Sequence, residues 1–324
     1  MSIAQSSIEH NGTVLDIGGS KLDTAFASHL PAAIAGTEWF PKELAYIKGM
    51  EKWCAIANRS YQTTDELSII ESTAKEVVAQ LPSGTCIIDM GAADSFKFEP
   101  YVREFISQKK ECTYVPLDLS ETSLIRHIDN VKKAFPAVKC VGLWGSFQQG
   151  DRFFHQIPQG RLFLSLGSIF YNAPDEMCVD RCAEFRRHLA GSDRLIVGQD
   201  APSVTESHSS QSSYQTKEYD AFFVRYLEGI QDHAGIVADA KSSWTYESNM
   251  DKSMHFFKVT ALKDMVCNNF GDYKISAGTS YKMFPSWKRG EAEIHEITKK
   301  EGLTIKTLGK AKNSGMRQYI IGPQ

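Results

Sequence analysis

The sequence lacks an excess of charge of either sign, and it lacks any apolar run long enough to cross a bilayer. Its 36 basic and 39 acidic residues leave a formal net charge of −3, so no polybasic surface indicates nucleic acid or anionic lipid as a partner. The longest apolar run, Leu162 to Tyr171, is interrupted by serine and glycine and is too short to span a membrane. Residues 1–12 are polar and lack the apolar core of a signal peptide. We therefore expect no nucleic-acid partner and no membrane association.

The sequence also lacks the Cys-x-x-Cys pattern. Its seven cysteines, at positions 54, 86, 112, 140, 178, 182 and 267, are odd in number, and several lie in apolar segments. Free buried thiols in a reducing compartment explain them best, so we expect a cytoplasmic protein. Cys178 and Cys182 stand one helical turn apart, but no second pair of ligands follows at metal spacing, so no metal site is expected.

Apolar strand patterns alternate with helical patterns through the middle of the chain. The strand patterns cover residues 85–90, 113–118, 138–144, 161–166 and 194–199, and the helical patterns cover residues 98–109, 121–134 and 174–190. Strands and helices that alternate at this spacing are typical of an α/β fold with a doubly wound parallel sheet. Residues 304–308 and 316–321 are expected to add a closing hairpin.

The flanking regions have a different character. Helical patterns at residues 41–57 and 64–80 precede the first strand of the sheet, and serines dominate a polar connection or lid at residues 203–213. Beyond it we expect a helix at 219–230, antiparallel strands within 256–282 and a helix at 287–301. These parts predict a second, mixed α+β lobe.

The loop after the first strand of the sheet is the strongest local signal for a site. Segment Ile87–Asp94 runs from an apolar strand through Gly91 into a helix, and ligands of doubly wound sheets bind at such strand ends. The fingerprint Gly-x-Gly-x-x-Gly is missing, so we expect a nucleoside without a pyrophosphate rather than a dinucleotide. Taken alone, the loop is explained equally well by plain strand-to-helix packing.

An acid at the end of the next strand makes this signal more specific. Asp118 can accept both hydroxyl groups of a ribose through its two oxygens. Its alternative role is to cap the following helix, which Ser120 is also able to do. Together, the Gly91 loop and Asp118 resemble the pattern of class I S-adenosylmethionine-dependent methyltransferases.

Two further strand ends carry candidate ligands. After residues 138–144, Phe147 can stack on an adenine ring and Ser146 can bond to its edge, with a core position as the alternative for Phe147. After residues 161–166, the amide of Asn172 suits a zwitterionic amino acid. Its alternative is to cap the helix that begins near Pro174.

In this order, the segments resemble the histidine-specific methyltransferase family of ergothioneine biosynthesis. They are most similar to its fungal branch, the dimethylallyltryptophan N-methyltransferases of ergot alkaloid pathways. The resemblance runs from about residue 40 to the end, and it is carried by Phe40–Tyr46, Ser60–Glu66, Ile88–Lys97, Tyr114–Ser120, Leu166–Asn172 and Thr279–Lys282. Each segment is only moderately specific, whereas their order and spacing together are distinctive.

The resemblance implies a class I methyltransferase domain with a Rossmann-like sheet at residues 66–200 and 281–324. Residues 1–65 and 201–280 would form the substrate-binding lobe. S-adenosyl-L-methionine would be the cofactor and S-adenosyl-L-homocysteine the product. The implied partner is a small, amino-acid-like molecule, and a monomer and a homodimer both remain open.

The resemblance also implies the site residues. The implied cofactor ligands are Tyr61, Gly91, Lys97, Asp118, Ser146 and Phe147. The implied substrate ligands are Tyr46, Tyr61, Asn172, Tyr214 and Ser280, and Tyr46 and Tyr61 would also be catalytic, by orienting the amine or passing its proton to water. Packing beside Leu44 and Ile47 is the alternative for Tyr46, and a loop position is expected for Tyr61.

Two departures from the family bear on the substrate. Gly278 takes the place of a glutamate that holds the imidazole in the histidine enzymes, and the loss of that partner costs about 1–3 kcal/mol. Tyr171 is expected to add bulk close to the pocket. We therefore expect N-methylation of a tryptophan-derived amine that resembles dimethylallyltryptophan. The alternatives are another amino acid or alkaloid amine, including histidine, and an inactive cofactor-binding regulator, and a nicotinamide dehydrogenase fits worst.

Overall fold

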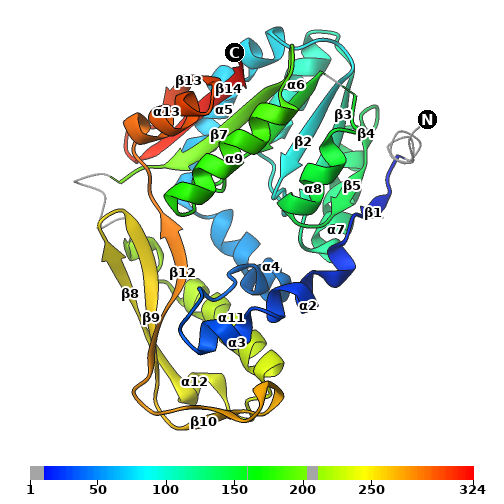
Figure 1. Cartoon of the computed structure of the whole chain (residues 1–324). Helices are drawn as coiled ribbons and strands as arrows, with labels where there is room; N and C mark the ends of the chain where they lie inside the picture. Colours follow the sequence, from blue (N-terminus) through cyan, green and yellow to red (C-terminus); the bar gives the residue numbers. More distant parts are fainter. Residues whose placement is uncertain (1–10, 159, 203–210) are drawn as a thin grey trace. The chain divides into compact units, whose positions relative to one another are not determined.

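The computed structural model describes residues 11–158, 160–202 and 211–324. The chain divides into two compact units, each with its own hydrophobic core (Figure 1). Unit 1 consists of Met1–Ser20, Ala57–Ser203 and Lys288–Gln324, and unit 2 consists of Lys21–Ile56 and Val204–Trp287.

Unit 1 is built on a mixed sheet with the strand order β1-β5-β3-β2-β6-β7-β14-β13, in which β4 also pairs with β3. The strands are β1 (Val14–Asp16), β2 (Thr85–Met90), β3 (Cys112–Asp118), β4 (Lys139–Cys140), β5 (Gly142–Trp144), β6 (Arg161–Ser165), β7 (Arg194–Asp200), β13 (Leu303–Lys310) and β14 (Met316–Pro323). Strand β14 is antiparallel to β7 and β13, and the other pairs are parallel. The expected α/β fold class, a doubly wound sheet with a closing hairpin, is confirmed.

Helices cover both faces of this sheet (Figure 1). One face packs against α5 (Tyr61–Ala79), α6 (Glu99–Ser107) and α7 (Glu121–Ala134), and the other against α8 (Phe147–Phe154), α9 (Asp175–His188) and α13 (Glu291–Lys300). Neighbouring residues of β2 face opposite layers, because Ile87 belongs to the core under the first group and Ile88 to the core under the second. Strands buried on both faces explain the continuous apolar runs that predicted them.

Unit 2 is a mixed α+β lobe. Its helices are α2 (Leu22–Ala27), α3 (Leu30–Ile34), most of α4 (Glu43–Ala57), α11 (Lys217–Ala234) and α12 (Ala240–Ser243). Strands β8 (Trp244–Asp251), β9 (Met254–Ala261) and β12 (Ser280–Trp287) form an antiparallel sheet in the order β12-β9-β8, and β10 (Met265–Cys267) pairs with β11 (Tyr273–Ile275). The buried face of α11, with Phe222, Phe223 and Tyr226, lies in the core of this unit.

Several boundaries differ from the sequence-based expectation. The expected loop position of Tyr61 is wrong, because Ser60 caps α5 by accepting the amide hydrogen of Gln62 at 3.2 Å, and Tyr61 lies in the first turn. The strand expected at 138–144 is broken into β4 and β5. Trp287 is the last residue of β12, where it pairs with Met254 of β9. The helix expected to begin at residue 287 therefore begins only at Glu291. The serine-rich connection expected at 203–213 lies largely outside the described residues.

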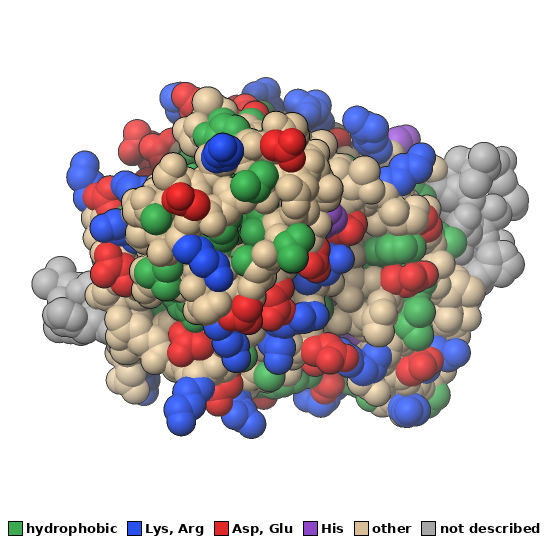
Figure 2. All heavy atoms as spheres, turned by 90° about the horizontal axis from the view of Figure 1, so that it is seen from below, with side chains coloured by type: hydrophobic (Ala, Val, Ile, Leu, Met, Phe, Trp, Pro, Cys, Tyr) green, Lys and Arg blue, Asp and Glu red, His purple; other side chains and the backbone are tan. Residues whose placement is uncertain are grey.

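The surface and the thiols agree with the composition. All seven cysteines are free, as expected, and six of them are buried. No helix in the described part of the chain is both long and apolar enough to cross a membrane. Acidic and basic side chains are intermingled on the face shown in Figure 2, which fits the nearly balanced charge of the sequence.

Candidate active site

The loop after β2 closes on a glycine that the backbone and the available space both require. Gly91 has a φ of +79°, and its amide donates to the carbonyl oxygen of Leu117 in β3 over 2.8 Å. A Cβ atom on Gly91 would lie 2.8 Å from Cδ1 of Ile169 and 3.6 Å from Cζ of Phe147. Any larger residue would be strained and would push these neighbouring side chains away.

Asp118, the last residue of β3, holds the same loop. Its Oδ2 accepts the amide hydrogen of Ala93 at 2.9 Å, and its Oδ1 accepts that of Ser120 at 3.0 Å. Burial raises the pKa of the Asp118 carboxyl to about 6 against the effect of these backbone donors, so the group is mostly ionised at neutral pH. Ser120 caps α7 with its own side chain. Each carboxylate oxygen of Asp118 has a second lone pair that is able to accept a ribose hydroxyl.

The start of α8 brings Phe147 to this loop. Ser146 caps the helix in a capping box, in which its Oγ accepts the amide hydrogen of Gln149 at 3.3 Å and Oε1 of Gln149 accepts that of Ser146 at 2.8 Å. The Ser146 side chain therefore already has a structural role. Phe147 is half-buried, and its ring edge faces Gly91. The structure thus brings Gly91, Asp118 and Phe147 together at the carboxyl edge of the sheet.

A buried polar chain lies in the strands that carry this loop, and sequence reasoning missed it. Oδ2 of Asp89 accepts the hydroxyl hydrogen of Tyr114 at 2.8 Å, and the Tyr114 oxygen lies 2.9 Å from Nε2 of His127. Burial raises the pKa of Asp89 to about 7 and lowers that of His127 to about 4. His127 is therefore neutral, and because Tyr114 donates its proton to Asp89, the Nε2–H of His127 donates to Tyr114. The three residues come from β2, β3 and α7, so no local pattern predicts them.

Lys97 forms a buried ion pair within unit 1. Its Nζ lies 2.7 Å from Oε2 of Glu66, and the same oxygen accepts the amide hydrogen of Gly167 at 2.9 Å. Oε1 of Glu66 has no hydrogen-bond partner among the described residues. A Cβ atom on Gly198 would lie 1.5 Å from it, so the glycine in β7 makes room for this carboxylate. Glu66 was not predicted as a site residue, although it ends the motif at residues 60–66 that carried the family resemblance.

A second buried ion pair lies at the end of β7. Oδ2 of Asp200 accepts the hydroxyl hydrogen of Tyr61 at 2.8 Å and an amide hydrogen of Gln62 at 2.9 Å, and it lies 3.2 Å from Nζ of Lys288. The expected site residue Tyr61 is thus joined to three residues that the sequence did not single out. Asp200 is 138 positions or more from its partners in α5, and no spacing rule relates such distant residues.

Asn172 lies in the loop after β6. A hydrogen bond connects this loop to the end of β7. Ser168 in this loop has a φ of +60°, and its Oγ accepts the amide hydrogen of Asp200 at 2.9 Å. Asn172 is half-buried. The N-cap position of α9 is occupied by Pro174, which makes no side-chain capping bond, and Asn172 lies two residues before it. The loop therefore places Asn172 at the same sheet edge as Tyr61 and Asp200.

Tyr171 points into the core rather than toward a pocket. It is fully buried, and its hydroxyl lies 2.5 Å from Oγ1 of Thr298 in α13 and 3.8 Å from Sγ of Cys182 in α9. Burial raises the pKa of Tyr171 well above its usual range. The expectation that this side chain narrows a substrate pocket is wrong, because the ring fills space between two helices.

In unit 2, Tyr46 lies on α4 within a group of aromatic rings. Its ring centroid is 5.2 Å from that of Trp53, 6.0 Å from that of Phe222 and 5.9 Å from that of Phe284. Burial raises the pKa of Tyr46 far above its usual range. The hydroxyl therefore keeps its proton, which suits a hydrogen-bond donor and not a base. The packing role expected as the alternative accounts for these ring contacts.

Tyr214 and Ser280 lie apart in unit 2. The Tyr214 hydroxyl donates to Oγ of Ser286 at 3.0 Å, and its ring stacks on His255 with centroids 3.6 Å apart. Ser280 is exposed at the other end of β12, where its Oγ lies 2.8 Å from that of Thr260. The strand between Ser280 and Ser286 spans about 20 Å. The register of β12 against β9 shifts between Met283 and Ser286, an irregularity that no sequence pattern indicates.

Gly278 is explained by its own backbone. It has a φ of +87° in the turn before β12, and no heavy atom lies within 4 Å of the position that a Cβ atom would take. The turn by itself therefore requires a glycine.

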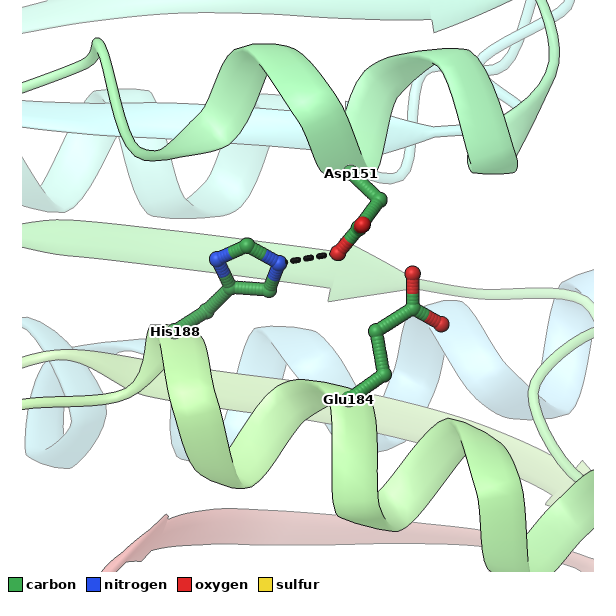
Figure 3. A group of neighbouring side chains, drawn as sticks. All are labelled: Asp151, Glu184 and His188. Carbon is green, nitrogen blue, oxygen red and sulfur yellow. Dashed lines mark hydrogen bonds and ion pairs between the residues drawn. The ribbon is translucent and has the colours of Figure 1, made fainter.

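A further group of ionisable side chains joins α8 to α9 (Figure 3). Asp151 pairs with Nε2 of His188, and Glu184, one turn before His188, points toward the same carboxylate. Their ligand atoms lie within 4.8 Å of one another. Burial and the facing carboxylate of Asp151 raise the pKa of Glu184 to about 7. Near neutral pH a proton shared by the two acids thus already relieves their repulsion.

Comparison with known proteins gives matches over most of the chain. A family model described as histidine-specific methyltransferase, SAM-dependent, matches residues 35–322. Ergothioneine biosynthesis protein 1 of Neurospora crassa is 29% identical over 144 residues, which cover 44% of this chain and 16% of that protein. The 4-dimethylallyltryptophan N-methyltransferase easF of Aspergillus fumigatus is 25% identical over 184 residues, 55% of this chain and 54% of the relative. The chain thus spans about half the length of such relatives or less.

Two other similarities extend further along the chain. The N-methyltransferase imqF of Aspergillus flavus is 23% identical over 294 residues, which cover 84% of this chain and 79% of that protein. Among solved structures, an S-adenosylmethionine-dependent methyltransferase from Clostridium acetobutylicum is 10% identical with a TM-score of 0.45, and the match covers 84% of this chain and 98% of that one.

Proposed function

Because the chain belongs to the histidine-specific, S-adenosylmethionine-dependent methyltransferase family, we propose that it methylates the amine nitrogen of an amino acid or of an alkaloid precursor derived from one. A tryptophan-derived acceptor that resembles dimethylallyltryptophan is favoured, since relatives named for that substrate match about half of the chain. The observation that carries the proposal is the group formed by Gly91, Asp118 and Phe147 at the carboxyl edge of the unit 1 sheet.

We assign the cofactor to this group of residues. The carboxylate of Asp118 accepts the ribose hydroxyls, the ring of Phe147 lies on the adenine, and Gly91 lets the nucleoside approach the backbone. Ser146, Tyr61 and Lys97 complete the assigned set. An acid with two acceptor oxygens beside an aromatic ring suits a nucleoside, and the glycine-rich cradle that a pyrophosphate needs is missing from the sequence.

The reaction is a direct displacement. S-adenosylmethionine supplies a methyl group on a sulfonium, whose leaving group is a neutral thioether. The deprotonated amine of the acceptor attacks, so that its lone pair forms the new N–C bond while the C–S bond breaks and its electrons stay on sulfur. The residues of this chain have to hold the amine in line, which can supply about 7–11 kcal/mol of the barrier reduction.

We assign the substrate contacts unit by unit. In unit 1, Asn172 and Tyr61 bind the amino and carboxylate groups of the acceptor. In unit 2, Tyr46 is assigned as a hydrogen-bond donor because its hydroxyl stays protonated. Tyr214 and Ser280 are alternatives to each other, because Ser286, the partner of Tyr214, lies about 20 Å along β12 from Ser280.

Histidine is the second candidate acceptor, because the family description names it. The argument from Gly278 against histidine is weakened, since the turn conformation supplies a separate reason for that glycine. Gly278 does not distinguish histidine from a tryptophan-derived acceptor, so an activity assay has to do so.

A panel assay tests the proposal. The purified chain is incubated with S-adenosylmethionine and with dimethylallyltryptophan, tryptophan, histidine and other amino acids, and S-adenosylhomocysteine release and product mass are followed. We expect turnover with one class of amine and a mass gain of a methyl group on its α-nitrogen. Binding of the cofactor without release of S-adenosylhomocysteine with any amine would instead identify an inactive cofactor-binding protein.

A further inference from the structure

Asp200 is a buried acid whose two oxygens are used very unequally. The residue is 1% exposed. Its Oδ2 accepts from the Tyr61 hydroxyl at 2.8 Å and from Gln62 at 2.9 Å, and it faces the ammonium of Lys288 at 3.2 Å. Its Oδ1 has no hydrogen-bond partner among the described residues. A buried oxygen without a partner is uncommon, and a functional role is one of the explanations for it.

The position of this carboxylate is fixed by rigid elements of unit 1. Asp200 ends β7, and its amide is bonded to Ser168 in the loop after β6. At Gly315, in the β13–β14 hairpin, a Cβ atom would lie 2.1 Å from the carbonyl oxygen of Ala201 and 2.9 Å from Oδ1 of Asp200, so the hairpin can approach this closely only with glycine. Tyr61, on the other side, is held in the first turn of α5.

The bond to Asp200 decides what the Tyr61 hydroxyl can do. A phenol has one hydrogen, and here that hydrogen is donated to Oδ2 of Asp200. An amide hydrogen of Gln62 already approaches the phenolic oxygen, with its Nε2 at 3.5 Å. Toward a further group the oxygen can then act only as an acceptor, through its other lone pair. An amine or ammonium N–H is a donor and is the complementary partner for such an oxygen.

We propose that Asp200 is a positioning residue for methyl transfer, which takes the hydroxyl hydrogen of Tyr61 and thereby makes the phenolic oxygen an acceptor for an N–H of the methyl-accepting amine. This inference rests on the proposed function. The ammonium form of the acceptor first loses one proton to water, and a remaining N–H donates to Tyr61. The nitrogen lone pair then points away from Tyr61 toward the methyl carbon.

Because removal of Asp200 alone would leave Lys288 buried without a counter-charge, the test uses variants that stay neutral. Asp200→Asn/Lys288→Met, which keeps an acceptor oxygen without the charge, is the reference, and Asp200→Ala/Lys288→Met removes the acceptor. Each is also made with Tyr61→Phe. Thermal unfolding and calorimetric affinity for S-adenosylhomocysteine show that each variant is folded and binds the nucleoside.

We expect Asp200→Ala/Lys288→Met to lower kcat about tenfold relative to Asp200→Asn/Lys288→Met, with nucleoside affinity changed less than about twofold. In the Tyr61→Phe background the same change should lower kcat less than about twofold, since the two residues act as one unit. An equal loss in both backgrounds, the same kcat for the two double variants, or a parallel loss of nucleoside affinity would overturn the positioning role. Absence of turnover by the unmodified chain with every amine would overturn the proposed function, and this role with it.

Discussion

The ammonium of Lys97 lies 2.7 Å from Oε2 of Glu66, and both side chains are almost fully buried within unit 1. The same carboxylate oxygen holds the amide of Gly167 in the loop after β6. Any contact of Lys97 with the cofactor therefore comes from a cation that is already neutralised. The pair also sets the position of the loop that carries Asn172, so its effect on catalysis extends beyond the cofactor.

Breaking this pair is expected to destabilise the protein. Glu66→Gln leaves a buried ammonium without its counter-charge, which typically costs about 3–5 kcal/mol. The double variant Glu66→Gln/Lys97→Met should recover much of that loss, because neither charge remains. Denaturant unfolding measures both values. The exposed pair of Lys306 and Glu76 is the control, since Glu76→Gln should change the free energy of unfolding by less than about 1 kcal/mol. Equal effects of Glu66→Gln and Glu76→Gln would contradict the account.

Two glycines separate the backbone requirement from the ligand requirement. Gly91 and Gly84 have φ values of +79° and +85°, but a Cβ atom meets Ile169 only at Gly91 and open space at Gly84. Alanine at either position should cost about 1–2 kcal/mol of stability from the left-handed conformation. Only Gly91→Ala should also weaken S-adenosylhomocysteine binding in calorimetry. Similar affinities for the two variants would argue against a ligand beside Gly91.

The Glu184 carboxyl predicts a pH dependence of stability. Its pKa is raised from 4.5 to about 7 by burial and by the facing Asp151. A raised pKa means that the folded state holds the proton more tightly, so this contribution to stability is complete below 4.5 and is lost as the pH rises through 7. Glu184→Gln cannot ionise. From about pH 5 to about pH 8, the melting temperature of the unmodified chain should therefore fall relative to that of the variant. Asp89 titrates in the same range in both proteins, so its effect cancels in the comparison. Parallel curves of melting temperature against pH would disprove the role of Glu184.

The sequence predicted the elements that carry the sheet. The predicted limits of β2, Thr85–Met90, and of α7, Glu121–Ala134, are those of the structure, because a strand buried on both faces and a capped amphipathic helix have strong local patterns. Strand β1 was missed, since Val14–Asp16 is a short edge strand that is only partly buried and pairs with β5 alone. Because these strands were predicted correctly, the residues predicted from their ends also lie at one edge of the sheet. These residues are Gly91, Asp118 and Phe147.

The rest of the candidate site depends on contacts that no sequence pattern contains. Glu66 and Lys97 are 31 residues apart and Tyr61 and Asp200 are 139 apart, so only the folded chain pairs them. The direction of a loop side chain is equally hidden, which is why Tyr171 was wrongly expected near a pocket. The contact between Tyr214 and Ser286, 72 residues apart in the sequence, is likewise visible only in the folded chain.

Calorimetric titration of the purified chain with S-adenosylhomocysteine shows whether Asp118 binds a nucleoside. Asp118→Ala is the matched variant, and circular dichroism shows that it is folded. We expect saturable binding of one nucleoside per chain that is lost in Asp118→Ala. If the unmodified chain does not bind, or if a folded Asp118→Ala binds with the same affinity, then Asp118 does not hold a nucleoside.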